Sequence, residues 1–122
     1  KAGVIYLVEL KDKSHLIRIT SPQSGATIKS PLTVEGEARG YWYFEASFPI
    51  TLLDAAGKQI ATGHGQAQGD WMTEDFVPFK ATLEFEKPAS PGVTGEGRLI
   101  LRKDNASGLP EYDDQTEVSV SF

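Results

Sequence analysis

The segment from residue 40 to residue 54 alternates apolar and polar side chains with a period of two. One set consists of Phe44, Ala46, Phe48, Ile50 and Leu52, with Trp42 in the same phase, and the other of Tyr43, Glu45, Ser47, Pro49 and Thr51. Successive side chains of a β-strand point to opposite faces, so this pattern predicts a half-buried strand and not a helix. The fold class is therefore β, although the pattern indicates no reaction.

Six further stretches combine β-branched or alternating residues with turn residues at their ends. They are 15–20, 32–39, 59–68, 79–86, 99–101 and 117–122. Seven short strands with no room for crossover helices predict an all-β fold, an immunoglobulin-like antiparallel β-sandwich, with a small barrel as the alternative. The chain has no cysteine, so no disulfide joins the sheets. Gly63 and Gly65 make the 59–68 strand weakly apolar, which favours an edge position.

A chain of 122 residues is the usual size of one domain. We assign residues 15–122 to that domain and residues 1–14 to an N-terminal segment. Within this segment, residues 4–11 are open to two interpretations: an extra edge strand, or a linker whose partner lies elsewhere. The chain begins at Lys1 without Met, so we expect a mature or excised fragment with any signal peptide or anchor upstream.

The charge balance argues against several classes of partner. The chain carries 17 acidic and 12 basic residues, a formal net charge of -5. Binding to nucleic acid or to an anionic membrane surface depends on basic residues, so neither is expected. The longest apolar run, residues 4–8, is far shorter than the roughly 20 residues of a spanning helix, so we expect no direct membrane insertion.

Aromatic residues supply one candidate binding site. Tyr41, Tyr43 and Trp71, with Trp42, could stack on a sugar or a peptide, because amphipathic rings combine a flat apolar face with a polar edge. Strand parity places Tyr41 and Tyr43 outward and Trp42 in the core. Core packing is the simpler interpretation of Trp42 and Trp71, because large aromatic residues are usually buried.

The acidic stretch 104–114 supplies a second candidate, a calcium loop with Asp104, Asp113 and Asp114 as ligands, because hard cations prefer several oxygen ligands. The spacing departs from the EF-hand pattern, since Gly108 comes one position early. A solvated turn whose Asp and Asn side chains cap backbone amides is the favoured interpretation. We therefore expect no metal and no cofactor.

Catalytic residues are scarce in this sequence. His64 is the residue that most resembles a general base, and His15 lies far from it along the chain. No Gly-x-Ser-x-Gly nucleophile motif is present, and two histidines do not complete a three-histidine zinc site. The alternating surface glutamates are typical of solvated strand faces and not of a cleft that raises a pKa. We expect no enzymatic activity.

Several spaced blocks together resemble a known family. They are residues 17–22, 30–40, 44–48, 69–71, 76–79 and the tail 99–122, which includes Lys103-Asp104-Asn105-Ala106-Ser107-Gly108. In these blocks the chain is similar to the Gmad2 family, the immunoglobulin-like domain of bacterial spore germination proteins, over about residues 16–122. The resemblance implies an extracytoplasmic bacterial domain, secreted or membrane-anchored, without assigned catalytic residues. It does not make this chain a germination protein.

The expected function is a non-catalytic interaction or structural module of the bacterial cell envelope, whose partners are other envelope protein domains. The alternatives are a module that binds glycan or peptidoglycan fragments through Tyr41, Tyr43 and Trp71, and a Ca²⁺-stabilised adhesion-type domain. Self-association is a further possibility, because an open strand edge at 61–69 or 4–11 would accept a strand from another chain.

Overall fold

A computed structural model describes residues 13–86, 95–104, 108–110 and 113–122. Within these residues the chain forms eight β-strands and one short 3-10 helix, and the expected all-β fold is confirmed. The elements are β1 Ile17–Ser21, β2 Ala26–Thr27, β3 Leu32–Arg39, η1 Gly40–Trp42, β4 Ser47–Asp54, β5 Gln59–Ala67, β6 Phe76–Leu83, β7 Glu96–Arg102 and β8 Gln115–Ser121. Each of the seven predicted strands has a counterpart, and the structure adds the two-residue β2.

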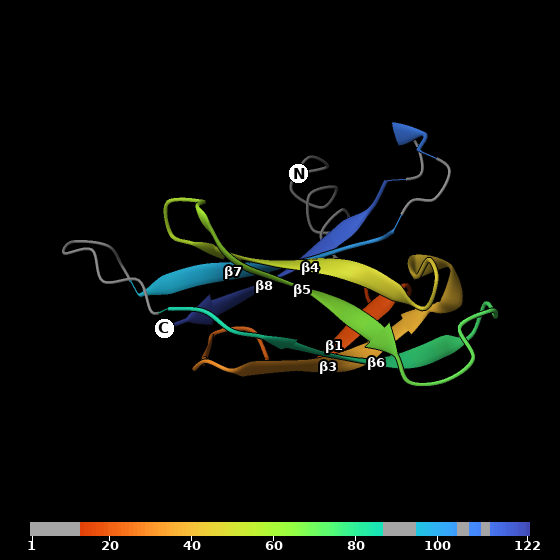
Figure 1. Cartoon of the computed structure of the whole chain (residues 1–122), viewed down its shortest axis with the longest axis horizontal. Helices are drawn as coiled ribbons and strands as arrows, with labels where there is room; N and C mark the ends of the chain where they lie inside the picture. The colour runs from red at the N-terminus through yellow and green to blue at the C-terminus, as the bar shows by residue number, and fades with distance from the viewer. Residues whose placement is uncertain (1–12, 87–94, 105–107, 111–112) are drawn as a thin grey trace, which may run out of the picture.

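The strands form two layers that belong to one continuous sheet. Hydrogen bonding gives the order β1-β3-β6-β5-β4-β7-β8-β2, and every pair is antiparallel except the parallel β2–β8 pair. Figure 1 shows β1, β3 and β6 in the lower layer and β4, β7 and β8 in the upper one. Strand β5 runs from the upper layer to the lower and joins them.

The prediction that the glycine-rich strand lies at an edge is wrong. Strand β5 pairs with β4 along most of its length and with β6 through Gln66↔Lys80 and Ala67↔Phe79. Its glycines have a packing role: a Cβ at Gly65 would lie 2.5–2.9 Å from ring atoms of Phe48. These glycines let β5 pass close over the core where it changes layers.

The core lies between the two layers. From β4 it takes Phe48, Ile50 and Leu52, all fully buried, as the alternation predicted. The Phe48 ring packs edge-on against Phe79 of β6, with ring centres 4.9 Å apart. Burial of each large side chain of this kind contributes about 1.5–3 kcal/mol, so the interlayer contacts are the main source of stability.

The N-terminal segment is described only from residue 13 onward. Residues 13–16 form a turn in which the Ile17 N–H donates to the Lys13 carbonyl oxygen at 2.9 Å, and β1 follows. Residues 4–11, the suggested extra strand or linker, lie outside the described residues. Among the residues with described coordinates, no helix is long and apolar enough to cross a membrane.

Candidate functional site: the loop end of the sandwich

Three loops meet at one end of the sandwich. They connect β3 to β4, β5 to β6 and β7 to β8. The strand register brings the bases of the first two together through Arg39↔Phe76 and Ser47↔Gln66, and the pairing of β4 with β7 through Ile50↔Leu101 brings the third beside them. We call this the loop end; it lies at the right of Figure 1. In a β-sandwich, loops at one end form a continuous surface on a rigid scaffold, which makes them a common place for binding residues.

Gly40 brings the first two of these loops into contact. Its N–H donates to the Asp75 carbonyl oxygen at 3.1 Å, and its carbonyl oxygen accepts from the Tyr43 N–H at the end of η1. A Cβ at position 40 would overlap the carbonyl oxygens of Thr73 and Trp71. Only glycine permits this close approach, so the β5–β6 loop rests directly on η1.

Short side chains fix the shape of the β5–β6 loop. The Asp70 carboxylate accepts from the Met72 N–H at 3.0 Å, and the Thr73 hydroxyl oxygen accepts from the Asp75 N–H at 3.1 Å. Such local bonds hold tight turns without help from a sheet. As a result the loop keeps Trp71 half-buried against the core and leaves the Met72 side chain 76% exposed.

Trp42 and Tyr43 are both buried at the base of the loop end. Burial of Trp42 was predicted, whereas the prediction that Tyr43 faces outward and Phe44 inward is wrong. The reason is local: η1 interrupts the strand, and Glu45 and Ala46 adopt left-handed backbone conformations with φ of 51° and 69°. The two-residue alternation therefore begins only with β4.

The Tyr43 hydroxyl ties the β3–β4 connection to β6. It donates to the Val77 carbonyl oxygen at 2.6 Å in a buried setting. Burial raises the pKa of the Tyr43 phenol well above its usual range, because the charged phenolate would lose its hydration there. Tyr43 is thus a structural residue, and it presents no open ring face to a ligand.

The loop end carries a patch of exposed apolar side chains. We define the loop-end patch as Tyr41, Phe44, Met72 and Leu109, which are 42–76% exposed, with Trp71 half-buried beside them. Among the residues that can be placed, these four are the only large apolar side chains classed as exposed. The Lys103 ammonium lies 5.8 Å from the centre of the Tyr41 ring. Tyr41 and Trp71 were predicted site residues, whereas Phe44, Met72 and Leu109 were missed.

Two of the three aspartates proposed as calcium ligands have separate structural roles. The Asp104 N–H donates to the Trp42 carbonyl oxygen at 3.0 Å, which ties the β7–β8 loop to η1. The Asp114 carboxylate pairs with the Lys13 ammonium at 3.0 Å and accepts from the Gln115 N–H. Over the described ranges, no three His, Cys, Asp or Glu side chains form a group that could hold a metal ion, and Asp104, Asp113 and Asp114 therefore do not make one.

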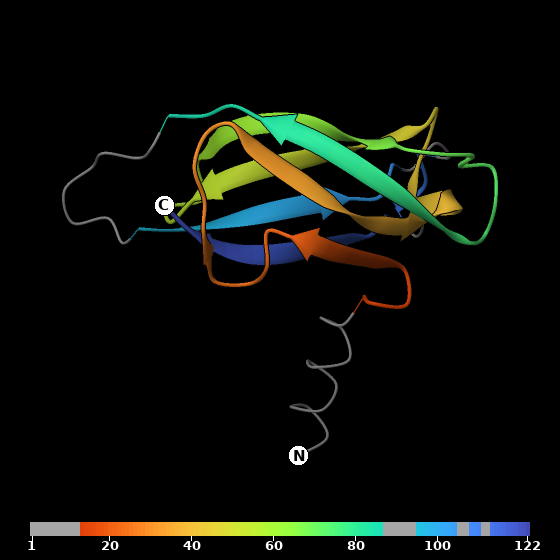
Figure 2. The same cartoon turned by 90° about the horizontal axis from the view of Figure 1, so that it is seen from below.

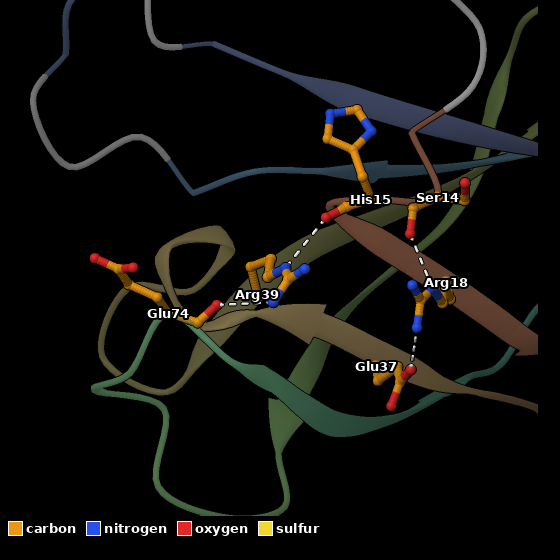
Figure 3. Close-up of polar contacts among 6 residues, drawn as sticks. All are labelled: Ser14, His15, Arg18, Glu37, Arg39 and Glu74. Carbon is orange, nitrogen blue, oxygen red and sulfur yellow. Dashed lines mark hydrogen bonds and ion pairs between the residues drawn. The ribbon is translucent and has the colours of Figure 1, made fainter.

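Two arginines hold the turn at residues 13–16 beside the loop end. Figure 3 shows the Arg18 guanidinium donating to the Ser14 carbonyl oxygen at 2.9 Å and the Arg39 guanidinium donating to that of His15 at 3.1 Å. Both guanidinium carbons lie 4.0 Å from the centre of the Phe76 ring. Figure 2 shows β1 starting at this same end. Sequence reasoning missed this cluster, whose signal is arginine at outward positions of neighbouring strands.

The two histidines do not form a catalytic arrangement. His64 is exposed on β5 opposite Pro49, and His15 is exposed in the turn before β1. In the placed parts of the chain, the His64 side chain makes no hydrogen bond or ion pair that would orient it as a base. In a nucleophile–base pair a third group orients the base, and within the described residues neither histidine side chain has such a partner.

Comparisons with known proteins add one match. A family model described as Gmad2, the immunoglobulin-like domain of bacterial spore germination, matches residues 16–108. Neither a curated protein nor a solved structure matches the chain. The matched residues include two complete loops of the loop end and the start of the third, so the family's shared sequence extends into the site.

Proposed function

The chain belongs to the Gmad2 family of immunoglobulin-like domains, and from that premise we propose that it is a non-catalytic interaction module of the bacterial cell envelope. It works outside the cytoplasm and docks another envelope protein through the loop end. Support for the module comes from the family, whose description assigns a fold and a bacterial context but no reaction. Support for the docking surface comes from the apolar side chains at the loop end.

The clustering of exposed apolar side chains carries the proposal. Tyr41, Phe44, Met72 and Leu109 come from three different loops, yet all lie at one end of the sandwich. Exposed apolar residues scattered over a surface are ordinary, whereas their gathering at one end of the molecule favours an interaction surface. Met72 and the aromatic rings also match the residue types that are enriched at protein interfaces. The loop end therefore has the composition of a protein-docking surface.

Site-directed photo-crosslinking in the native cell tests the docking surface. A photoreactive residue at position 72 should give a crosslinked protein adduct, and one at exposed Gln59, near the opposite end, should not. The Tyr41→Ser and Phe44→Ser changes together should remove the adduct from position 72. Equal adducts from both positions, or none from position 72, would contradict docking at the loop end.

Location is tested with the same full-length protein. The sequence given contains no cysteine, so Ser24→Cys introduces a single exposed thiol in the described domain. A membrane-impermeant maleimide should label this thiol in intact cells as fully as in lysed cells. Labelling that requires lysis would place the domain in the cytoplasm and contradict the envelope role, with a cytoplasmic cysteine protein as the control.

Glycan binding is the second candidate, because Tyr41 and Trp71 lie on neighbouring loops of the loop end. Stacking on a sugar ring uses such aromatic faces together with polar groups. Phe44, Met72 and Leu109 offer no side-chain hydrogen bond to a sugar, which favours the protein partner. A soluble peptidoglycan fragment that changes Trp71 fluorescence, with the change lost in Tyr41→Ser, would favour the glycan.

A further inference from the structure

We propose that the partner of the loop end is cationic as well as apolar: a polypeptide surface that presents lysine or arginine between apolar side chains. This inference rests on the proposed docking function and names the chemistry of the partner. It follows from the charges on the loops that carry the loop-end patch.

Acidic residues lie on the same three loops as the loop-end patch. The described parts of these loops, 40–46, 68–75, 103–104, 108–110 and 113–114, hold seven acidic residues and one basic residue, Lys103. The acidic residues are Glu45, Asp70, Glu74, Asp75, Asp104, Asp113 and Asp114. Seven acidic residues and one basic residue give these loop residues a formal charge of -6, against -5 for the whole chain. Arg18 and Arg39, beside the loop end, direct their guanidinium groups to backbone carbonyl oxygens of the turn at residues 13–16.

Three of these carboxylates are exposed and remain available to a partner. Glu45, Glu74 and Asp75 make no side-chain hydrogen bond or ion pair within the described structure, whereas Asp70 and Asp114 are engaged in local bonds. Figure 3 shows the Glu74 carboxylate pointing away from Arg39, whose guanidinium contacts the Glu74 carbonyl oxygen instead. The Arg39 guanidinium is therefore occupied by backbone carbonyl oxygens, while Lys103, the one basic residue of these loops, lies beside the Tyr41 ring.

The two features have different physical effects on binding. Apolar side chains supply most of the affinity, because their burial removes apolar surface from water. The carboxylates on the same loops attract a cationic partner, repel an anionic one and make association depend on salt. Desolvation of a carboxylate by an uncharged partner is unfavourable, so a neutral apolar partner should bind less well than a basic one.

Labelled peptides provide the probe. Three peptides of twelve residues share six leucines and carry six lysines, six glutamines or six glutamates at the remaining positions. Fluorescence anisotropy with the full chain should show the lysine peptide binding at least tenfold more tightly than the glutamine peptide. The glutamate peptide should show no binding, and the lysine peptide should lose at least fivefold in affinity between 50 and 300 mM salt.

Two matched triple variants separate a local effect from the net charge. The triple variant with Glu45→Gln, Glu74→Gln and Asp75→Asn should bind the lysine peptide at least tenfold more weakly than wild type. The control variant replaces three exposed acidic residues elsewhere, by Glu35→Gln, Glu84→Gln and Glu96→Gln. It removes the same amount of charge and should lower the affinity for the lysine peptide less than threefold. Equal losses in the two triple variants would show a nonspecific charge effect and overturn the inference.

A patch variant distinguishes failure of this inference from failure of the docking function. The double variant with Tyr41→Ser and Met72→Ser should lower the affinities for the lysine peptide and the glutamine peptide by the same factor. If the glutamine peptide binds as tightly as the lysine peptide and still depends on Tyr41 and Met72, the patch docks partners but the cationic chemistry is wrong. If no peptide responds to this double variant, the docking function is overturned as well. Unchanged melting temperatures establish that the variants are folded.

Discussion

Removal of the Tyr43 hydroxyl is predicted to destabilise the domain in a pH-dependent way. The hydroxyl donates to the Val77 carbonyl oxygen at 2.6 Å, and the residue is 3% exposed. Tyr43→Phe leaves that buried carbonyl without its donor, which costs about 1–3 kcal/mol. For a domain of this size the loss corresponds to a fall of roughly 4–12 °C in melting temperature.

The pH dependence follows from the raised pKa of the buried phenol. In the unfolded chain Tyr43 ionises near pH 10, whereas in the folded protein it keeps its proton to higher pH. The stability that this group contributes is fully present below about pH 10 and declines above it, by about 1.4 kcal/mol per pH unit. Tyr43→Phe abolishes this decline, so the gap between wild type and variant narrows as the pH rises.

Urea unfolding followed by the fluorescence of Trp42 and Trp71 measures both effects. The wild-type protein should exceed Tyr43→Phe by about 1–3 kcal/mol at pH 8, and the difference should be smaller by roughly 1.4 kcal/mol at pH 11. Tyr41→Phe, which alters an exposed ring two residues away, is the matched control and should change stability by less than about 0.5 kcal/mol. A gap that stays constant from pH 8 to pH 11 would refute the reasoning.

The remaining predictions concern residues that shape the loop end and the core. Gly40→Ala should cost roughly 2–4 kcal/mol in urea unfolding, because its Cβ overlaps two carbonyl oxygens of the β5–β6 loop, while Gly69→Ala, with open space around it, should stay within about 0.5 kcal/mol. Gly65→Ala should cost roughly 1–3 kcal/mol by crowding the Phe48 ring, and a melting temperature equal to that of wild type would contradict this packing role. Arg39→Gln should speed hydrogen exchange at the Leu16 and Ile17 amides by about tenfold without unfolding the domain, because it removes the bond to the His15 carbonyl oxygen. Exchange at Leu99, in the core of β7, is the internal control.

The regular strands were predictable from sequence, because alternation is a local property. Phe48, Ile50 and Leu52 of β4, and Val118 and Val120 of β8, face the core where period two places them. The prediction of which side chains are buried failed where the backbone is not an extended strand. Tyr43 and Phe44 exchange faces because η1 and the left-handed Glu45 and Ala46 rotate the chain before β4 begins.

The position of β5 was not predictable from its composition. Glycine in a strand is common at edges, and Gly63 and Gly65 suggested one. In the structure their missing side chains make room for Leu83 and Phe48, which arrive from other strands. The position of β5 depends on tertiary contacts between residues that are distant in sequence. The sequence of residues 59–68 alone does not reveal these contacts.

The loop end could be predicted only in part, for the same reason. Tyr41 and Trp71 stood out as aromatic residues, but their grouping with Phe44, Met72 and Leu109 at one end depends on three loops meeting there. Gly40 and the local bonds of Asp70 and Thr73 hold two of these loops in a defined shape. A surface that is already ordered loses less conformational entropy on binding. Gly40→Ala should loosen this surface and therefore lower the affinity for the lysine peptide even at temperatures where the variant stays folded. Because the variant keeps every side chain of the loop-end patch, side-chain composition alone would predict no change in affinity.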